Sequence, residues 1–188
     1  MSAVLLAMSF LFAAGAPTAT PFAREPWCWD VRGAITVSFS AGDCASVVGL
    51  CTQGVIDADG FLEGTTRYTA TGIGGGVAGE TSIVTPPAEP PSTWTYAGEL
   101  LVTTALGTLR MNDVGVLDTA HGLFTELDRV LDGTGLYEGA TGTLYMFGTT
   151  YPDGSGFEGD VRGRLCLPTA PPPKAKARGG KELQPHAT

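Results

Sequence analysis

Residues 131–150, LDGTGLYEGATGTLYMFGTT, place five glycines among residues that favour β-strands, with no obvious catalytic group between them. Glycine weakens a flat strand, but it relieves crowding where a strand bends or bulges. Four of these glycines, within residues 133–142, fall where the chain must turn and then bend into the next strand. The stretch therefore predicts a strongly curved sheet, and it indicates architecture more than chemistry.

Length and composition agree with a β-rich domain. The chain has 188 residues, which is enough for one domain with a sizeable core. Charged residues make up only 16% of it, against 27 glycines and 13 prolines. This balance suits short strands and many turns better than long solvent-facing helices. The formal charge of −8 argues against nucleic acid as a partner.

Short runs of alternating or apolar residues predict eight strands. We expect them at residues 33–40, 52–57, 61–71, 93–103, 106–117, 123–131, 141–150 and 157–165. Asp-Gly pairs mark three of the tight turns between them. Residues 72–92, rich in glycine and proline, form one long irregular stretch that we expect to be a flexible mouth loop. Eight strands at short spacing predict an up-and-down antiparallel barrel or a sandwich.

The two ends of the chain differ from this body. Residues 1–16 combine an apolar run with small residues, as a secretory signal peptide does, and the run is too short for a comfortable membrane span. The alternative is a buried N-terminal helix. Residues 168–188 are rich in proline and carry four basic residues and one acid, which predicts a disordered tail. We therefore divide the chain into a signal and linker (1–23), a barrel (24–167) and a tail (168–188).

The cysteines fit an exported protein that is secreted or held at the cell surface. All four follow the predicted signal, and an even count in an exported chain favours disulfides. Four cysteines allow three pairings. We favour Cys44 with Cys51, which closes a local loop, and Cys28 with Cys166, because the first and last strands of an even-stranded barrel are antiparallel neighbours. With two histidines and no C-x-x-C pair, we expect no metal site.

The opening stretch also carries a family resemblance. GTGLYEGATGTL (133–144) resembles the G-x-G-x-F/Y-x-G-A-x-G signature of the allene oxide cyclase and dirigent protein superfamily. The flanking segments 112–132 and 156–168 resemble secreted bacterial relatives of that superfamily, so the likeness covers roughly residues 93–168. It implies an eight-stranded antiparallel barrel with an interior pocket, often oligomeric. The matched motif is structural, so the resemblance implies a fold and not an activity.

An eight-stranded barrel is wide enough to be filled by side chains or to hold one small ligand. Strand parity predicts a set of apolar pocket residues, for each of which plain core packing is the alternative role. These ligand-pocket candidates are Tyr68, Trp94, Tyr96, Leu100, Val102, Leu109 and Met111.

Asp113 is the one candidate for a catalytic residue. It shares the parity of Met111, and an inward acid in an apolar setting would have a raised pKa. Alternatively, Asn112 and Asp113 form a bulge or turn that bonds its own backbone. His121 lies beside Gly122 in a predicted turn, which favours a surface position over a role as general base.

The strand at residues 141–150 has two apolar faces, because Tyr145 and Phe147 oppose Leu144 and Met146. One face of a barrel strand must point outward, and an exposed apolar patch is a liability. We therefore expect a homo-oligomer interface to cover the outward face, whichever of the two pairs lies on it.

Three functions follow from these expectations. The first is an exported barrel that encloses or steers a small apolar molecule without a cofactor. The second is a cyclase or isomerase of the allene oxide cyclase-like superfamily, which would act mainly by positioning a reactive intermediate. The third is a filled, non-enzymatic barrel at the cell surface. Inward polar groups in an open cavity would favour the second, and a solid interior would favour the third.

Overall fold

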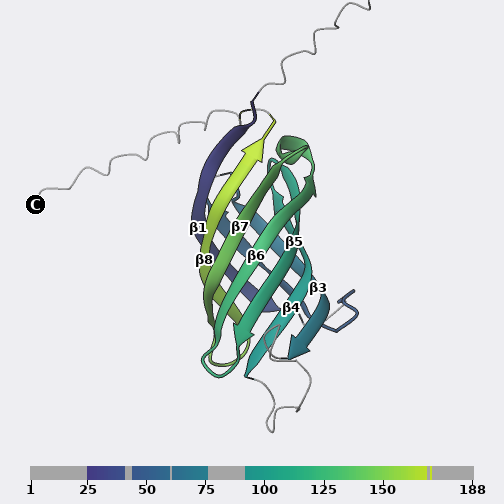
Figure 1. Cartoon of the computed structure of the whole chain (residues 1–188), viewed down its shortest axis with the longest axis vertical. Coiled ribbons are helices and arrows are strands. Elements are labelled where there is room, and N and C mark those ends of the chain that lie inside the picture. The colour runs from purple at the N-terminus through teal and green to yellow at the C-terminus, as the bar shows by residue number, and fades with distance from the viewer. Residues whose placement is uncertain (1–24, 41–43, 60, 76–91, 169, 171–188) are drawn as a thin grey trace, which may run out of the picture.

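In the computed structural model, the described residues are 25–40, 44–59, 61–75, 92–168 and 170. They form eight antiparallel strands that close into one barrel in chain order (Figure 1). Closure excludes the sandwich that the sequence left open. The strands are β1 (Trp27–Phe39), β2 (Cys51–Ala58), β3 (Gly64–Gly75), β4 (Thr93–Thr104), β5 (Gly107–Asp118), β6 (Leu123–Gly133), β7 (Thr141–Thr150) and β8 (Gly156–Leu167).

The barrel closes where β1 pairs with β8, and a disulfide crosses this seam. Cys28 and Cys166 are direct cross-strand partners, with their Cα atoms 4.0 Å apart. The second disulfide joins Cys44 to Cys51, at the start of β2. Both pairings are those predicted from the sequence. Two disulfides are compatible with an extracellular protein.

Two strands, β1 and β3, extend furthest beyond their predicted bounds. β1 begins at Trp27 and not at residue 33, because its inward and outward alternation already starts there and Val31 is buried. β3 starts at Gly64 and continues to Gly75, into the glycine-rich stretch that we expected to be irregular. There the backbone pairs with β4 beyond a register shift between Ala70 and Gly72. Backbone pairing needs no side chain, so a loop-like composition did not prevent strand formation. The remainder of the predicted mouth loop, 76–91, lies outside the described residues.

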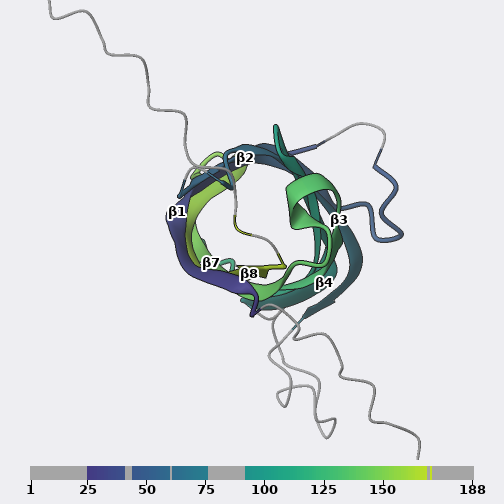
Figure 2. The same ribbon diagram turned by 90° about the horizontal axis from the view of Figure 1, so that it is seen from above.

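One end of the barrel is packed solid. A single 3-10 turn, η1 (Gly135–Tyr137), lies inside the ring of strands when the barrel is viewed from above (Figure 2). Tyr137 is fully buried, and its hydroxyl donates a hydrogen bond to the carbonyl of Phe61. The backbone N–H of Leu136 donates to the carbonyl of Leu106 at 2.8 Å. Together with buried leucines from β7 and β8, the turn closes the end at which β1 begins.

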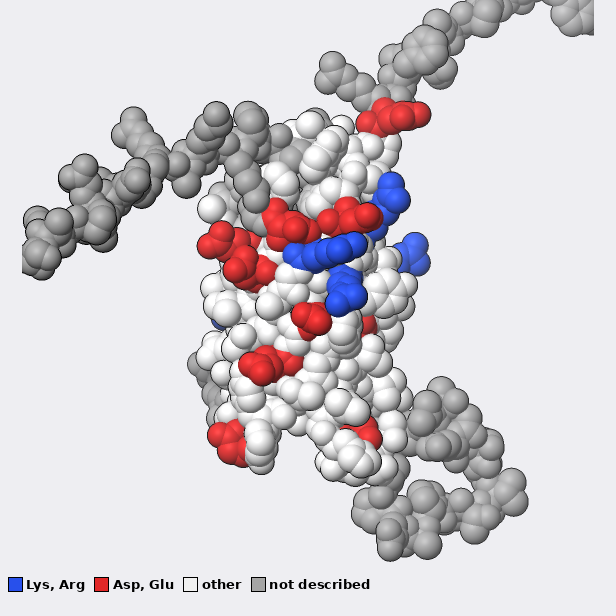
Figure 3. Space-filling view, turned by 90° about the vertical axis from the view of Figure 1, so that its left-hand side faces the viewer, with Lys and Arg blue, Asp and Glu red and all other residues white. Residues whose placement is uncertain are grey.

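The outer surface carries the basic residues of the barrel. The face around β1 and β8 shows acidic and basic side chains mixed over one half, while the other half shows scattered acidic side chains (Figure 3). Arg110 on β5 pairs with Glu99 at 3.0 Å and with Asp132. The arginines in the described part of the chain all occupy outward positions: Arg32, Arg67, Arg110, Arg129, Arg162 and Arg164.

The predicted signal segment and nearly all of the predicted tail lie outside the described residues. Within the described residues, no helix has the length and apolar character that crossing a membrane would require.

Candidate functional site

The opposite end of the barrel holds a cavity that is open to solvent. It lies where β1 and β7 end and β8 begins. Its volume is about 70 Å³, or about 600 Å³ when all the empty space out to the open mouth is included. Most of the wall is apolar, and two of its rings, Phe124 and Phe157, pack edge to face with centroids 4.7 Å apart. The apolar wall residues are Ile35, Val37, Phe39, Leu50, Leu100, Leu117, Phe124 and Phe157.

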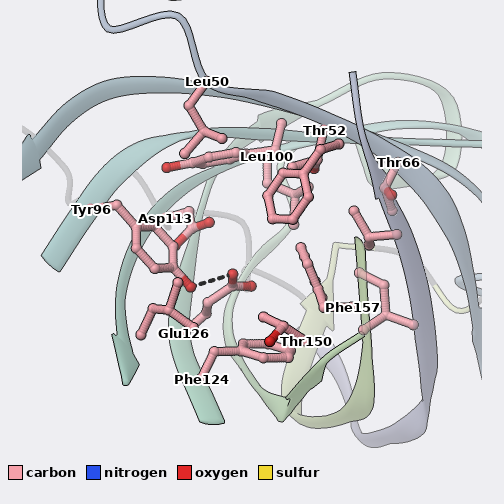
Figure 4. Close-up of a pocket in the computed structure, with 15 residues that line it drawn as sticks. Leu50, Thr52, Thr66, Tyr96, Leu100, Asp113, Phe124, Glu126, Thr150 and Phe157 are labelled. Carbon is pink, nitrogen blue, oxygen red and sulfur yellow. Dashed lines mark hydrogen bonds between the residues drawn. The ribbon is translucent and has the colours of Figure 1, made fainter. Parts of the chain in front are cut away.

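Tyr96, Asp113 and Glu126 lie together on one side of the cavity, and Thr66 lies on the opposite side (Figure 4). Tyr96 on β4 donates a hydrogen bond from its hydroxyl to Glu126 Oε1 on β6, at 2.7 Å. The ring of Tyr68 packs against that of Tyr96 at a centroid distance of 6.2 Å. The polar lining consists of Thr52, Thr66, Tyr68, Tyr96, Asp113, Glu126 and Thr150.

Three carboxyl groups point into the interior from two neighbouring strands. Asp113 on β5 and Asp128 on β6 are direct cross-strand partners. Glu126 occupies the preceding inward position of β6, two residues before Asp128. All three are buried: Asp113 is 2% exposed, Asp128 is 0% exposed and Glu126 is 8% exposed. Within the described residues, Asp113 Oδ1 and both carboxyl oxygens of Asp128 have no hydrogen-bond partner. Asp113 and Glu126 line the cavity, and Asp128 lies behind them.

Burial makes all three carboxyl groups hold their protons more tightly than in water. It raises the pKa of Asp113 to about 8, and the charge of Glu126 adds to this effect. It raises the pKa of Glu126 to about 7, against the hydrogen bond from Tyr96, which lowers it. Burial also raises the pKa of Asp128 well above its ordinary value, as do the charges of Asp113 and Glu126. The site therefore changes its ionisation near neutral pH.

Two glycines make room for the tyrosine rings. A Cβ atom on Gly98 would lie 2.5 Å from the ring of Tyr68, and one on Gly115 would lie 2.3 Å from the ring of Tyr96. Both glycines occupy inward positions, on β4 and β5. The tyrosines can therefore lie flat over the neighbouring strand, which brings the Tyr96 hydroxyl to Glu126.

The cavity contains some of the predicted pocket residues and not others. Tyr68, Tyr96 and Leu100 line it. Trp94 does not, and its side chain is 40% exposed. Three others are fully buried and do not line the cavity either, because they lie toward the packed end of the barrel: Val102, Leu109 and Met111.

Asp113 occupies a regular strand position, and the bulge or turn pair considered above does not form there. The register shift between β5 and β6 lies instead at Arg110 and Met111, where Leu131 is the extra residue on β6. His121 is in an exposed turn, where its Nδ1 lies 2.7 Å from Asp118 Oδ2, and it does not line the cavity. In the described ranges, no group of three or more His, Cys, Asp or Glu side chains has the arrangement of a metal site.

Glu126 and Asp128 were not among the predicted site residues. Both faces of residues 123–131 carry apolar side chains, so alternation alone did not reveal which face is inward. The tight turn before β6 could have identified the inward face of β6. It sets Asp118 opposite Leu123, and the same register sets Asp113 opposite Asp128. An inward Asp113 thus implies an inward Asp128.

No protein-family model matches the chain, and no curated protein shows significant similarity to it. Fold and site together define a class: a closed eight-stranded antiparallel barrel, packed at one end, with an apolar cavity at the other that ends on buried carboxyl groups.

Proposed function

We propose that this is an exported barrel that encloses a small, mainly apolar molecule in its open cavity, without a cofactor. The observation that carries the proposal is the cavity itself, with an apolar wall and a few unpaired polar groups at its inner end. Binding sites for small molecules usually have this composition, since the polar groups fix the orientation of the ligand. The open half of the interior argues against a barrel filled along its whole length, and the two disulfides support export.

The resemblance to allene oxide cyclases and dirigent proteins supports the same proposal. The superfamily signature falls at residues 133–144, which here comprise the end of β6, the η1 turn and the start of β7. A closed antiparallel barrel of eight strands is the fold which that resemblance implies. Membership of the superfamily remains a proposal based on these residues.

A second candidate is the cyclase or isomerase, and the buried acids favour it. A general acid or base works best when its pKa lies near the operating pH. Asp113 and Glu126 meet this condition at the surface of the cavity, with pKa values of about 8 and about 7. Either carboxyl group could then deliver or accept a proton while the apolar wall positions the substrate.

The test of the binding proposal is native mass spectrometry on protein purified from its own secreting host. We expect a retained small molecule that is lost on denaturation. Leu100→Trp should abolish retention by filling the cavity, whereas Leu101→Trp, on the outer face of the same strand, should not. A bare wild-type protein would contradict the proposal. Conversion of the recovered molecule by wild-type protein, but not by Asp113→Asn, would establish the second candidate.

We also propose that a second copy of the chain covers part of the outer surface. Val114, Leu127 and Tyr145 are consecutive cross-strand neighbours on β5, β6 and β7. All three are exposed: Val114 by 43%, Leu127 by 37% and Tyr145 by 53%. Phe147, which lies nearby, is 38% exposed. A continuous apolar row of this kind is typical of a protein interface.

A further inference from the structure

We propose that the molecule held in the cavity is an organic cation, a small apolar compound with a protonated amine, whose cationic head lies against Asp113 and Glu126. The inference rests on the proposed binding function and names the chemical class of its ligand. The apolar part of the compound would extend along the aromatic wall toward the mouth.

The first support is the charge of the inner end of the cavity. Three carboxyl groups converge there, while every arginine in the described part of the chain occupies an outward position. Asp113 lines the cavity, and its buried Oδ1 has no hydrogen-bond partner among the described residues. An alkylammonium group supplies both a positive charge and three N–H donors, which these acceptors lack.

The second support is the set of rings around the acids. Tyr68, Tyr96, Phe124 and Phe157 all line the cavity. Aromatic faces attract cations, and the attraction grows when water is excluded. The Tyr68 hydroxyl has no partner within the described residues, so its oxygen is free to accept a hydrogen bond from the amine. Rings and carboxyl groups together form a site that attracts an organic cation more strongly than a neutral molecule.

Other classes of ligand fit these groups less well. A carboxylate ligand would be repelled by the three acids. A divalent metal ion needs several oxygen ligands at short range, and no such cluster exists among the described side chains. A neutral alcohol or carbonyl compound could accept a hydrogen bond from one protonated carboxyl group, but it would leave the others without a partner. A cation interacts favourably with all three.

The proposal predicts that binding releases protons. In the free protein, burial keeps the pKa values of Asp113 and Glu126 high, and the charge of Glu126 raises that of Asp113 further, so both groups are partly protonated near pH 7. An adjacent ammonium group favours the carboxylates and lowers both pKa values. The amine keeps its own proton throughout this range, because the pKa of an alkylammonium is about 10. Its affinity should therefore rise as the pH increases from 5.5 to 8.5.

The experiment is isothermal titration calorimetry with three probes of matched shape: phenethylamine, phenethyl alcohol and 3-phenylpropionate. At pH 7.5 we expect phenethylamine to bind about tenfold more tightly than the alcohol, and the propionate to bind most weakly. Repeating the amine titration in buffers of different ionisation enthalpy should show proton release. Amine affinity should fall about tenfold between pH 8.5 and pH 5.5, while that of the alcohol should not fall.

Matched variants separate the cavity from the acidic surface. Asp113→Asn and Glu126→Gln should each remove most of the preference for the amine, and Asp160→Asn, on the outer face of β8, should leave it intact. Leu100→Trp retains every charge but fills the cavity, so amine binding that survives in it would be surface attraction and would overturn the inference. Equal affinity for amine and alcohol would also overturn it, while leaving the binding function standing. Failure of all three probes to bind would contradict both.

Discussion

Asp113 on β5 and Asp128 on β6 are direct cross-strand partners, and both side chains point into the barrel. Like charges at directly opposed positions destabilise a sheet, and burial adds to this cost. A barrel that needed only stability would place apolar residues at both positions. The fold therefore keeps two carboxyl groups that reduce its stability, and it keeps them beside the cavity.

The first prediction concerns stability against pH. A carboxyl group with a pKa raised by folding binds its proton more tightly in the native state, so the free energy of unfolding falls as pH rises from its unfolded pKa, about 4, to its folded pKa. For Asp113 the folded value is about 8. Asp113→Asn should therefore equal wild type in stability near pH 4 and exceed it by about 2 to 5 kcal/mol at pH 8.5, measured by urea unfolding.

Asp160→Asn, which removes an exposed carboxyl group from β8, is the control for this prediction. Its stability should follow that of wild type across the whole range. If the difference between Asp113→Asn and wild type stayed constant with pH, Asp113 would not carry a raised pKa.

The second prediction concerns the hydrogen bond between Tyr96 and Glu126. The Tyr96 hydroxyl donates to the Glu126 carboxyl group and lowers its pKa. Tyr96→Phe should therefore raise the pKa of Glu126 above about 7, by roughly one unit, as followed by the ¹³C chemical shift of its carboxyl carbon. Tyr68→Phe is the matched control, because no hydrogen bond joins Tyr68 to Glu126. A larger shift in the control would assign the effect to ring packing.

The third prediction concerns the space beneath Tyr96. In Gly115→Ala, the new methyl group would lie 2.3 Å from the Tyr96 ring, so the ring must move. We expect a loss of about 1 to 3 kcal/mol in the free energy of unfolding and a weaker retention of the ligand. Gly72→Ala is the control, since no atom lies within 4 Å of its added Cβ. Similar losses in both variants would show that glycine at position 115 is not needed for the ring.

The fourth prediction compares the two disulfides. Cys28–Cys166 spans 138 residues of sequence and Cys44–Cys51 spans 7. Chain entropy then predicts losses of about 5 kcal/mol for the Cys28→Ala/Cys166→Ala pair and about 2 to 3 kcal/mol for the Cys44→Ala/Cys51→Ala pair. Urea unfolding of the two double variants measures the difference. Equal losses would mean that the long bridge does not act through the unfolded chain.

The fifth prediction concerns the apolar row on the outer face. Leu127→Lys combined with Tyr145→Lys should convert a homo-oligomer into a monomer, as measured by light scattering after size-exclusion chromatography. Leu131→Lys changes another exposed residue of β6 outside that row and should leave the mass unchanged. A monomeric wild-type protein would contradict the proposed interface.

Much of the fold could be predicted from side-chain alternation. The runs of alternating or apolar residues correctly predicted all eight strands. They did not show which of the two apolar faces of β7 is inward, and the structure buries Leu144 and Met146 and exposes Tyr145 and Phe147. The closed barrel and both disulfides were predicted for related reasons. Alternation failed at β6, where leucines occupy outward positions and acids occupy inward ones. Hydrophobicity normally identifies the buried face of a strand. Because β6 buries acids at the site, its inward face has the polarity expected of an exposed face.

The η1 turn could not be predicted from its own residues. Tyr137 is buried because its hydroxyl reaches the carbonyl of Phe61, which is 76 residues earlier in the chain. Only the assembled barrel brings these two residues together. The same holds for the cavity, whose lining residues come from all eight strands.

The seam disulfide also determines how the barrel responds to a pulling force. β1 begins and β8 ends at the same end of the barrel, and Cys28–Cys166 links them there. Tension applied through the two ends of the chain passes across this one covalent bond, so the strands between the two cysteines carry none of it. The cavity would therefore keep its shape under a pulling force that would separate the strands of the reduced protein one after another.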